Sequence, residues 1–331
     1  MKLTELRYTE SFQRGTAFES ECPLEEAWSR IAQLGSAEHL RSIMDSAKPL
    51  PDEIVQYVVV RIRQAVEFRE AARKSTLLTS PLPLYYACLN LTRACVALRS
   101  GKTPSPHHGL SFRKNGADLL RGAAILRDGT FRDYLDATGM ARTRATISLS
   151  DALARIIEVH QDFAGFRGHS SLVVPVKMEA FLDGRVLLTF PEALKDFRVN
   201  WQLEFSKVAS DCALEQEGNA LRVRPEVPTS SAEAIAAFLH RSLEHDLCRR
   251  QRPTWYLVRE TDQDLVLPRA AYYFVALFVL GSVVRYEAEL LVDVADLDSE
   301  LGWLLRRVVA ASERFYPQLM LGWLRSEPVY F

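Results

Sequence analysis

The hydrophobic pattern of this 331-residue chain changes its period near residue 170, and that change limits the possible folds more than any other feature. Between about residues 20 and 165 apolar side chains recur at steps of three and four, which predicts a run of helices. Apolar and polar residues then alternate, and Asp183-Gly184 separates two alternating stretches as a hairpin turn does. The helical period returns near residue 270. We therefore expect an α+β protein, mainly helical, with a small antiparallel β layer.

We expect three parts along the chain. They are a helical domain over residues 1–165, an antiparallel β layer over 166–228 and a C-terminal helical part with one hairpin over 229–331. In the last part we expect a helix over 232–250 and a hairpin around Thr261-Asp262-Gln263, between the stretches TWYLVR and DLVLPR. The uncharged apolar run at 270–284 falls short of the roughly twenty residues that cross a bilayer, so we interpret it as a core helix packed on the first domain.

Several local signals refine this expectation. Residues 117–127 and 131–137 predict short helices, and Ser148 with Asp151 predicts a capping box at the start of a longer helix that passes His160. Pro317 is expected to interrupt the last helix before its final apolar turn.

Charge and cysteine content bear on the compartment and the partners. The formal charge of −1 comes from 41 basic and 42 acidic residues, so binding of RNA would require a local basic patch. Five cysteines without a C-x-x-C pair are typical of a reducing compartment. The N-terminus has no apolar signal core. We expect a cytoplasmic protein with no cofactor and no membrane contact.

The helix expected over residues 82–100 carries the most informative polar residues. Apolar side chains surround it almost completely, which predicts burial, and its one polar stripe is Tyr86, Asn90 and Arg93. A buried guanidinium requires a partner, so Arg93 needs a carboxylate, backbone carbonyls or a ligand phosphate. Gly101 and two prolines end the helix, and His107 and His108 follow.

This stripe permits two interpretations. In the first it is a site, with Arg93, His107 and His108 as catalytic candidates. In the second it clamps the loop at 103–110 through hydrogen bonds to backbone carbonyls. A second polar cluster, Arg285, Tyr286 and Glu287, follows the apolar run at 270–284 and would either supply a partner for Arg93 and ligand contacts or simply cap the core. The candidate ligand-binding residues are therefore Tyr86, Asn90, Arg285 and Tyr286.

Four segments together resemble the bacterial YaaC-like family. They are PLPLYYACLNLTRA, the HHGL after it, FVLGSVVRYEAELL and FYPQLMLGWL, and the resemblance extends from about residue 50 to the end. It implies a fold rather than a chemistry, because the family has no settled activity.

The first helical part also resembles HEPN-type helical domains, through a long amphipathic helix, an apolar helix and a proline-containing loop ending in His-Gly. That group includes metal-independent ribonucleases and inactive binding domains, many encoded among antiviral defence and toxin genes. Its ribonucleases carry an arginine followed, after four to six residues, by a histidine, and Arg155 and His160 fit this spacing. The resemblance implies His160 as general base on a ribose 2′-hydroxyl and Arg155 on the phosphate, in a composite site formed by two copies of the chain.

Helix geometry favours another interpretation of the same pair. On a continuous helix Arg155 shares the polar face with Asp151 and Glu158, whereas His160 lies on the apolar face. Arg155 would then be a solvated ion-pair partner and His160 a core or interface histidine.

No metal site is expected. His245 and Cys248, with His240 one turn earlier, have helical spacing, but no fourth ligand stands nearby. The common motifs for nucleotide binding, serine hydrolysis and zinc proteolysis do not occur.

Two functions follow from the sequence. The first is a non-catalytic or regulatory subunit of a bacterial defence or stress system, acting through a protein partner or a homodimer. The second is a metal-independent endoribonuclease that acts on RNA through Arg155 and His160, or through Arg93 with His107 or His108.

Overall fold

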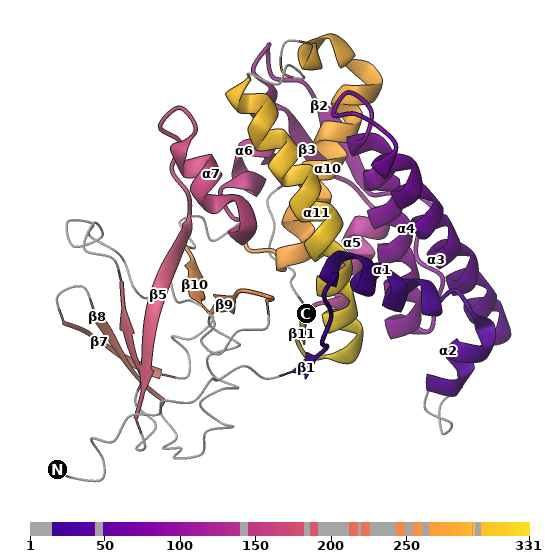
Figure 1. Ribbon diagram of the computed structural model, residues 1–331, viewed down its shortest axis with the longest axis horizontal. Helices are drawn as coiled ribbons and strands as arrows, with labels where there is room; N and C mark the ends of the chain where they lie inside the picture. The colour runs from indigo at the N-terminus through magenta and orange to yellow at the C-terminus, as the bar shows by residue number, and fades with distance from the viewer. Residues whose placement is uncertain are drawn as a thin grey trace. The chain divides into compact units, whose positions relative to one another are not determined.

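The structure is a computed structural model, and its contacts divide the chain into two units (Figure 1). The helical unit comprises residues 16–170 and 264–331, and the strand unit comprises 1–15 and 171–263. The structure describes residues 15–43, 49–139, 145–181, 186–190, 212–217, 220–225, 243–248, 254–259, 265–292, 294 and 299–331. The N-terminal and C-terminal helices therefore share one unit rather than forming separate parts.

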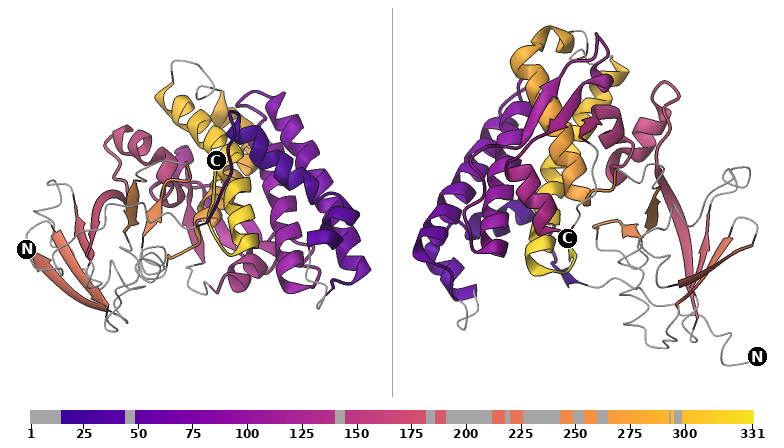
Figure 2. Two further views of the ribbon diagram at one scale, coloured as in Figure 1. Left: turned by 60° about the horizontal axis from the view of Figure 1, so that its bottom comes forward. Right: turned by 180° about the vertical axis from the view of Figure 1, so that it is seen from behind.

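Helix α4 (Pro81–Ser100) is the centre of the helical unit. It packs against α3 (Asp52–Arg73), α5 (Thr130–Ala137), α10 (Arg269–Tyr286) and α11 (Glu300–Arg325). Both views of Figure 2 show α3 and α4 side by side. Gly101 ends α4 in the left-handed conformation, at φ +66°, as the sequence predicts.

Helix α10 is the expected core helix. Every residue from 269 to 283 is buried, and the helix packs on α4 and α11. Among the described residues, no helix has the length and apolar content needed to cross a membrane.

Helices α1 (Pro23–Gln33) and α2 (Ala37–Ile43) lie beside α3, and α1 also packs on α11. The interruption expected at Pro317 is wrong, because α11 continues through it. Proline has no N–H to donate to the carbonyl of Glu313, and the indole Nε1 of Trp28 donates to that carbonyl instead, at 2.9 Å. After α11, β11 (Val329–Tyr330) pairs in parallel with β1 (Thr16–Ala17).

The expectation that residues 20–165 are entirely helical is also wrong. Strands β2 (Leu110–Arg113), β3 (Ala123–Leu126) and β4 (Thr146–Ser148) form an antiparallel sheet in that order. The helix predicted over 117–127 is a short 3-10 turn, Leu119–Arg121, followed by β3. Pairing on both edges of β3 outweighs the strong helical preference of its two alanines and Leu126.

The helix predicted from Ser148 begins as expected and ends early. Ser148 and Asp151 form the capping box, but α6 (Leu149–Leu153) is succeeded by a 3-10 turn (Ile157–Val159) and by α7 (His160–Gly165). Glu158 projects to α10, where it accepts from Arg269 and Tyr273. These bonds to another helix compete with continuation of α6.

The strand unit contains one antiparallel sheet in the order β7-β8-β6-β5-β10-β9. Strands β5 (Val173–Ala180) and β6 (Val186–Thr189) pair as predicted, although Asp183-Gly184 itself lies outside the described residues. Strand β7 (Cys212–Glu217) pairs with β8 (Ala220–Pro225), which pairs with β6. The α+β class is therefore confirmed.

One prediction for the region after residue 229 is wrong. Strand β10 (Trp255–Val258) lies between β5 and β9 (Glu244–His245), and the turn expected at Thr261-Asp262-Gln263 lies outside the described residues. Residues 244–245, expected in a helix, form β9, which removes the helical spacing of His245 and Cys248; His240 lies outside the described residues. The part of the chain that the structure describes holds no cluster of three potential metal ligands.

Candidate anion-binding site

Two polar stripes face each other where α3 and α4 run antiparallel. The rings of Phe68 and Tyr86 stack with centroids 5.3 Å apart, and Arg61 Nη1 donates to Asn90 Oδ1 at 3.2 Å. The Asn90 amide in turn donates to the Tyr86 carbonyl at 2.9 Å, so Asn90 links the stripe to its own helix and to α3. The stripe on α3 comprises Tyr57, Arg61, Gln64 and Phe68, which follow the same steps of four and three. It was not predicted from the sequence.

Arg93 connects α4 to the following loop. Its side chain is half-buried, its Nε donates to Thr130 Oγ1 at 3.1 Å, and its Nη2 donates to the Pro106 carbonyl. The structure thus shows the loop clamp, and the partner of Arg93 is not a carboxylate. Burial lowers the pKa of Arg93, and the positive charge of Arg61 acts in the same direction.

The loop with the paired histidines is held by its backbone. The N–H groups of Thr130 and Phe131 donate to the carbonyls of His107 and His108, at 2.8 and 3.1 Å. Gly109 adopts φ +84°, and a Cβ on Gly129 would lie 2.4 Å from the Gly109 nitrogen. The two glycines therefore permit a crossing of chain segments that fixes the loop beside Arg93.

The two histidines differ in their surroundings. His107 is exposed, whereas His108 is half-buried, with its ring centroid 5.4 Å from Phe278 and 6.4 Å from Tyr85. His108 Nδ1 accepts the Leu110 N–H at 3.2 Å. Burial lowers the pKa of His108, and nearby arginines lower it further, so the ring is neutral near pH 7.

Arg285 approaches the stripe from the end of α10. It donates to the Tyr86 hydroxyl and, at 3.0 Å, to the Tyr286 hydroxyl, and its guanidinium carbon lies 5.6 Å from the Tyr86 ring centroid. Tyr286 is largely exposed. The structure therefore brings Arg285 to Tyr86 as a second cation rather than as a counter-ion for Arg93, and Glu287 pairs with Lys114.

We call these residues the arginine–tyrosine cluster: Arg61, Tyr85, Tyr86, Arg93, His108 and Arg285. Within the described part of the chain, none of its arginines forms an ion pair with a carboxylate. Arg61 Nε and the Tyr85 hydroxyl are buried there without a hydrogen-bond partner. Burial raises the pKa of Tyr85, so the hydroxyl keeps its proton as a donor. Arginines without a carboxylate partner, together with buried donors without an acceptor, favour the binding of an anion.

The pair from the ribonuclease spacing lies elsewhere in the helical unit. Arg155 is 4% exposed and donates to the Asp151 carbonyl at 2.9 Å, while His160 is half-buried with Nδ1 against the Ile157 carbonyl. The solvated face expected for Arg155 is wrong, because α6 ends at Leu153 and its residues leave the helical period. Arg61 and Tyr85 are the residues of the arginine–tyrosine cluster that were not predicted from the sequence.

The arginine–tyrosine cluster lies on α3, α4, α10 and the loop after α4, within a mainly helical unit of an α+β protein. The chain belongs to the YaaC-like family, because the family model described as YaaC-like Protein matches residues 28–324. That match runs from α1 to α11. No curated protein and no solved structure matches the chain.

Proposed function

We propose that this chain is a non-catalytic regulatory protein that binds a phosphate-bearing ligand at the arginine–tyrosine cluster. In this proposal it serves as a subunit of a bacterial defence or stress system and acts through a protein partner or a homodimer. The observation that carries the proposal is that the charge of Arg93 acts on Arg61 and Tyr85, that Arg285 donates to Tyr86, and that none of these arginines pairs with a carboxylate among the described residues. The defence role and the HEPN-like character of the helices rest on the resemblance described above.

Phosphate suits this cluster better than a carboxylate does. Three guanidinium groups supply more positive charge than a single carboxylate neutralises, and a phosphate group offers several oxygens to separate donors. The buried Tyr85 hydroxyl adds a neutral donor near Arg93 and Arg285. Both arginines are close enough for their charges to interact with this hydroxyl. A phosphate would therefore relieve the repulsion among the arginines and satisfy an unpaired buried donor.

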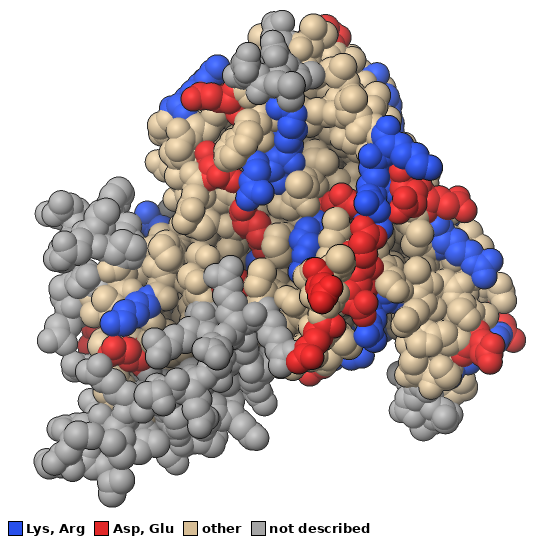
Figure 3. All heavy atoms as spheres, viewed as in Figure 1, with Lys and Arg blue, Asp and Glu red and all other residues tan. Residues whose placement is uncertain are grey.

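The surroundings of the candidate catalytic residues favour binding over catalysis. His108 is neutral and its Nδ1 is occupied by a backbone N–H, and Arg93 is tied to the loop. A nuclease built on Arg155 needs that arginine at the substrate phosphate. Arg155 is instead buried, and its guanidinium donates to the carbonyl of Asp151 in α6. On the face shown in Figure 3, acidic and basic side chains of the helical unit are intermixed, which does not favour a broad RNA surface there.

The test is a calorimetric titration of the full chain with inorganic pyrophosphate at constant ionic strength. We expect saturable binding that weakens at least about tenfold in Arg93→Gln and in Arg285→Gln, which corresponds to about 1.4 kcal/mol for each. Arg121→Gln is the matched control, because Arg121 is exposed and pairs only with nearby Asp118. Absence of binding, or equal binding by all three variants, would overturn the proposal.

The alternative function is tested with the same protein. Total RNA is incubated with the wild type and with His160→Ala in the presence of a chelator. We expect intact RNA in both samples. Cleavage by the wild type that His160→Ala abolishes would replace this proposal with the metal-independent endoribonuclease.

A further inference from the structure

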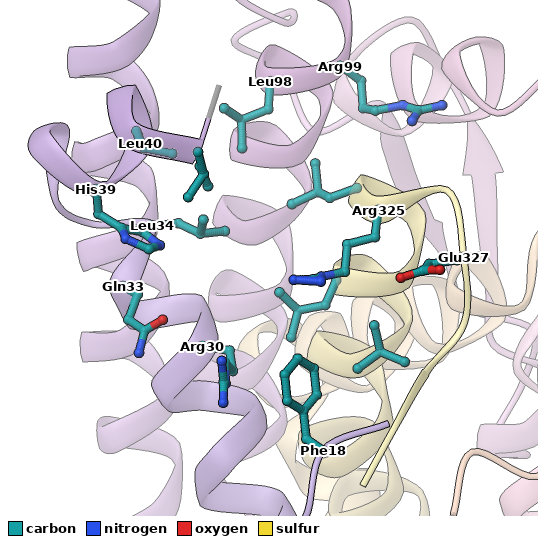
Figure 4. A pocket seen from close by; sticks show the side chains of 14 residues that line it. Phe18, Arg30, Gln33, Leu34, His39, Leu40, Leu98, Arg99, Arg325 and Glu327 are labelled. Atoms are coloured by element: carbon teal, nitrogen blue, oxygen red, sulfur yellow. The ribbon is translucent and has the colours of Figure 1, made fainter. Parts of the chain in front are cut away.

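A pocket of about 530 Å³ lies in the helical unit, between the C-terminal ends of α4 and α11 and the helices α1 and α2 (Figure 4). Its volume falls within the range of small-molecule sites. It uses Leu98 and Arg99 of α4, whereas the arginine–tyrosine cluster uses residues 85–93 of the same helix. The pocket is therefore a separate site, which the proposed function does not explain.

The floor of the pocket is apolar. Leu34, Leu40 and Val329 line it, and each is buried. Phe18 forms one wall and stacks on Phe331 with ring centroids 5.4 Å apart. An aliphatic or aromatic body of a ligand would lose its contact with water on this floor.

The polar side of the pocket has a cation with no counter-ion. Figure 4 shows Arg325 extending from α11 into the pocket, with Gln33 and His39 on the opposite wall. Among the described residues the guanidinium of Arg325 forms no ion pair and no hydrogen bond. Its carbon lies 5.7 Å from the ring centroid of Phe18.

The other charged side chains that line the pocket have partners. Arg30 pairs with Glu26 at 2.7 Å, and Arg99 donates to Ser326 Oγ at 2.7 Å. Glu327 is the one acidic residue of the lining, and it accepts from the Thr16 hydroxyl. Arg99 and Arg325 are therefore both without a carboxylate partner among the described residues, and of the two only Arg325 also lacks a hydrogen bond from its guanidinium.

We propose that this pocket binds a small molecule with an apolar body and one anionic head group. The body lies on the floor formed by Leu34, Leu40 and Val329, and the head group pairs with Arg325. A neutral ligand would leave Arg325 without a counter-ion, and a cationic ligand would be repelled by it. The head group is a carboxylate or a phosphate, since a guanidinium binds both.

The test uses four probes with the same eight-carbon chain: octanoate, octyl phosphate, octanol and octyltrimethylammonium. Binding to the full chain is measured by calorimetry below the concentration at which each probe forms micelles. We expect one or both anions to bind at least about tenfold more tightly than the neutral and cationic probes. The tighter of the two anions identifies the head group. Equal affinity for all four probes, or binding of none, would overturn the proposal.

Two variants assign the binding to this pocket. Arg325→Gln should reduce the affinity for the better anion at least about tenfold, whereas Arg41→Gln should leave it unchanged. Arg41 is an exposed arginine of α2 that pairs with Asp52 and does not line the pocket. Melting temperatures of both variants show whether they fold. Unchanged anion affinity in folded Arg325→Gln contradicts the proposal, as does full displacement of the anion by pyrophosphate, which would mean one site instead of two.

Discussion

Arg61 and Arg69 lie eight residues apart on α3, about two helical turns, yet the groups around them differ in charge. Arg69 is 3% exposed, and its guanidinium donates to Glu25 and to Glu313, both at 2.9 Å. Arg61 instead meets the side-chain amides of Asn90 and Gln64, and its Nε has no partner. One arginine joins α3 to α1 and α11 through carboxylates, and the other faces only neutral groups and further cations.

The pKa values of two arginines express the same contrast. Burial lowers the pKa of Arg69, but its hydrogen bonds to the carboxylates of Glu25 and Glu313 outweigh that effect, and the net pKa is raised. Burial also lowers the pKa of Arg93, and no carboxylate reverses the change. The Arg69 cluster is therefore complete without a ligand, whereas the arginine–tyrosine cluster retains the capacity to stabilise an added anion.

The largest expected effect is the loss of the paired arginine. Arg69→Ala removes the buried cation that Glu25 and Glu313 share and leaves them only the partly exposed Arg73, so we expect the free energy of unfolding to fall by roughly 2–3 kcal/mol. Arg93→Ala removes only hydrogen bonds to a hydroxyl and a carbonyl and should cost roughly 1–2 kcal/mol. Denaturant unfolding of both variants measures the difference. Equal losses would show that the two clusters contribute alike to stability.

The next effect concerns the loop that borders the arginine–tyrosine cluster. Gly129→Ala places a Cβ against the backbone of Gly109, so we expect a loss of roughly 1–3 kcal/mol in unfolding free energy and weaker pyrophosphate binding. Gly116→Ala is the control, because Gly116 also has a positive φ but no atom lies within 4 Å of its added Cβ. Melting temperature and titration are measured for both. Normal pyrophosphate affinity in a destabilised Gly129→Ala would mean that the loop does not position Arg93.

The smallest effect is the response to pH, and the two clusters should respond in different windows. The hydrogen bond from Arg69 lowers the pKa of Glu25, so this stabilisation is present above the unfolded pKa near 4.5 and is lost as pH falls through the folded pKa. Burial lowers the pKa of His108, so its contribution is present above the unfolded pKa near 6.5 and is lost as pH falls below it.

Melting temperatures between pH 8 and pH 3 would separate the two windows. His108→Gln should remove part of the decline below about pH 6.5 and leave the acid decline below about pH 4.5 unchanged, since these are the unfolded values of the two groups. An identical profile for wild type and His108→Gln would show that His108 is protonated as readily in the folded chain as in the unfolded one.

Sequence alone determined those features that depend on neighbours within one helical turn. The extents of α4 and α10 follow from apolar spacing, the end of α4 follows from Gly101, and the capping box follows from Ser148 and Asp151. The hydrogen bonds of a helix and its caps join residues at most a few positions apart, so the local pattern contains the information needed to predict them. The same spacing identified the stripe with Arg93, and its contact with loop carbonyls is one of the two interpretations that the spacing left open.

Only the tertiary structure decided which distant groups complete these elements. Strand β3 forms where a helix was expected because β2 and β4 offer backbone partners, and α11 continues through Pro317 because Trp28 satisfies the freed carbonyl. In the site, Arg61 and Arg285 join Arg93 through the register of α3 against α4 and the packing of α10. Such contacts are set by the simultaneous burial of several helix faces, which the spacing of residues within any single helix does not specify.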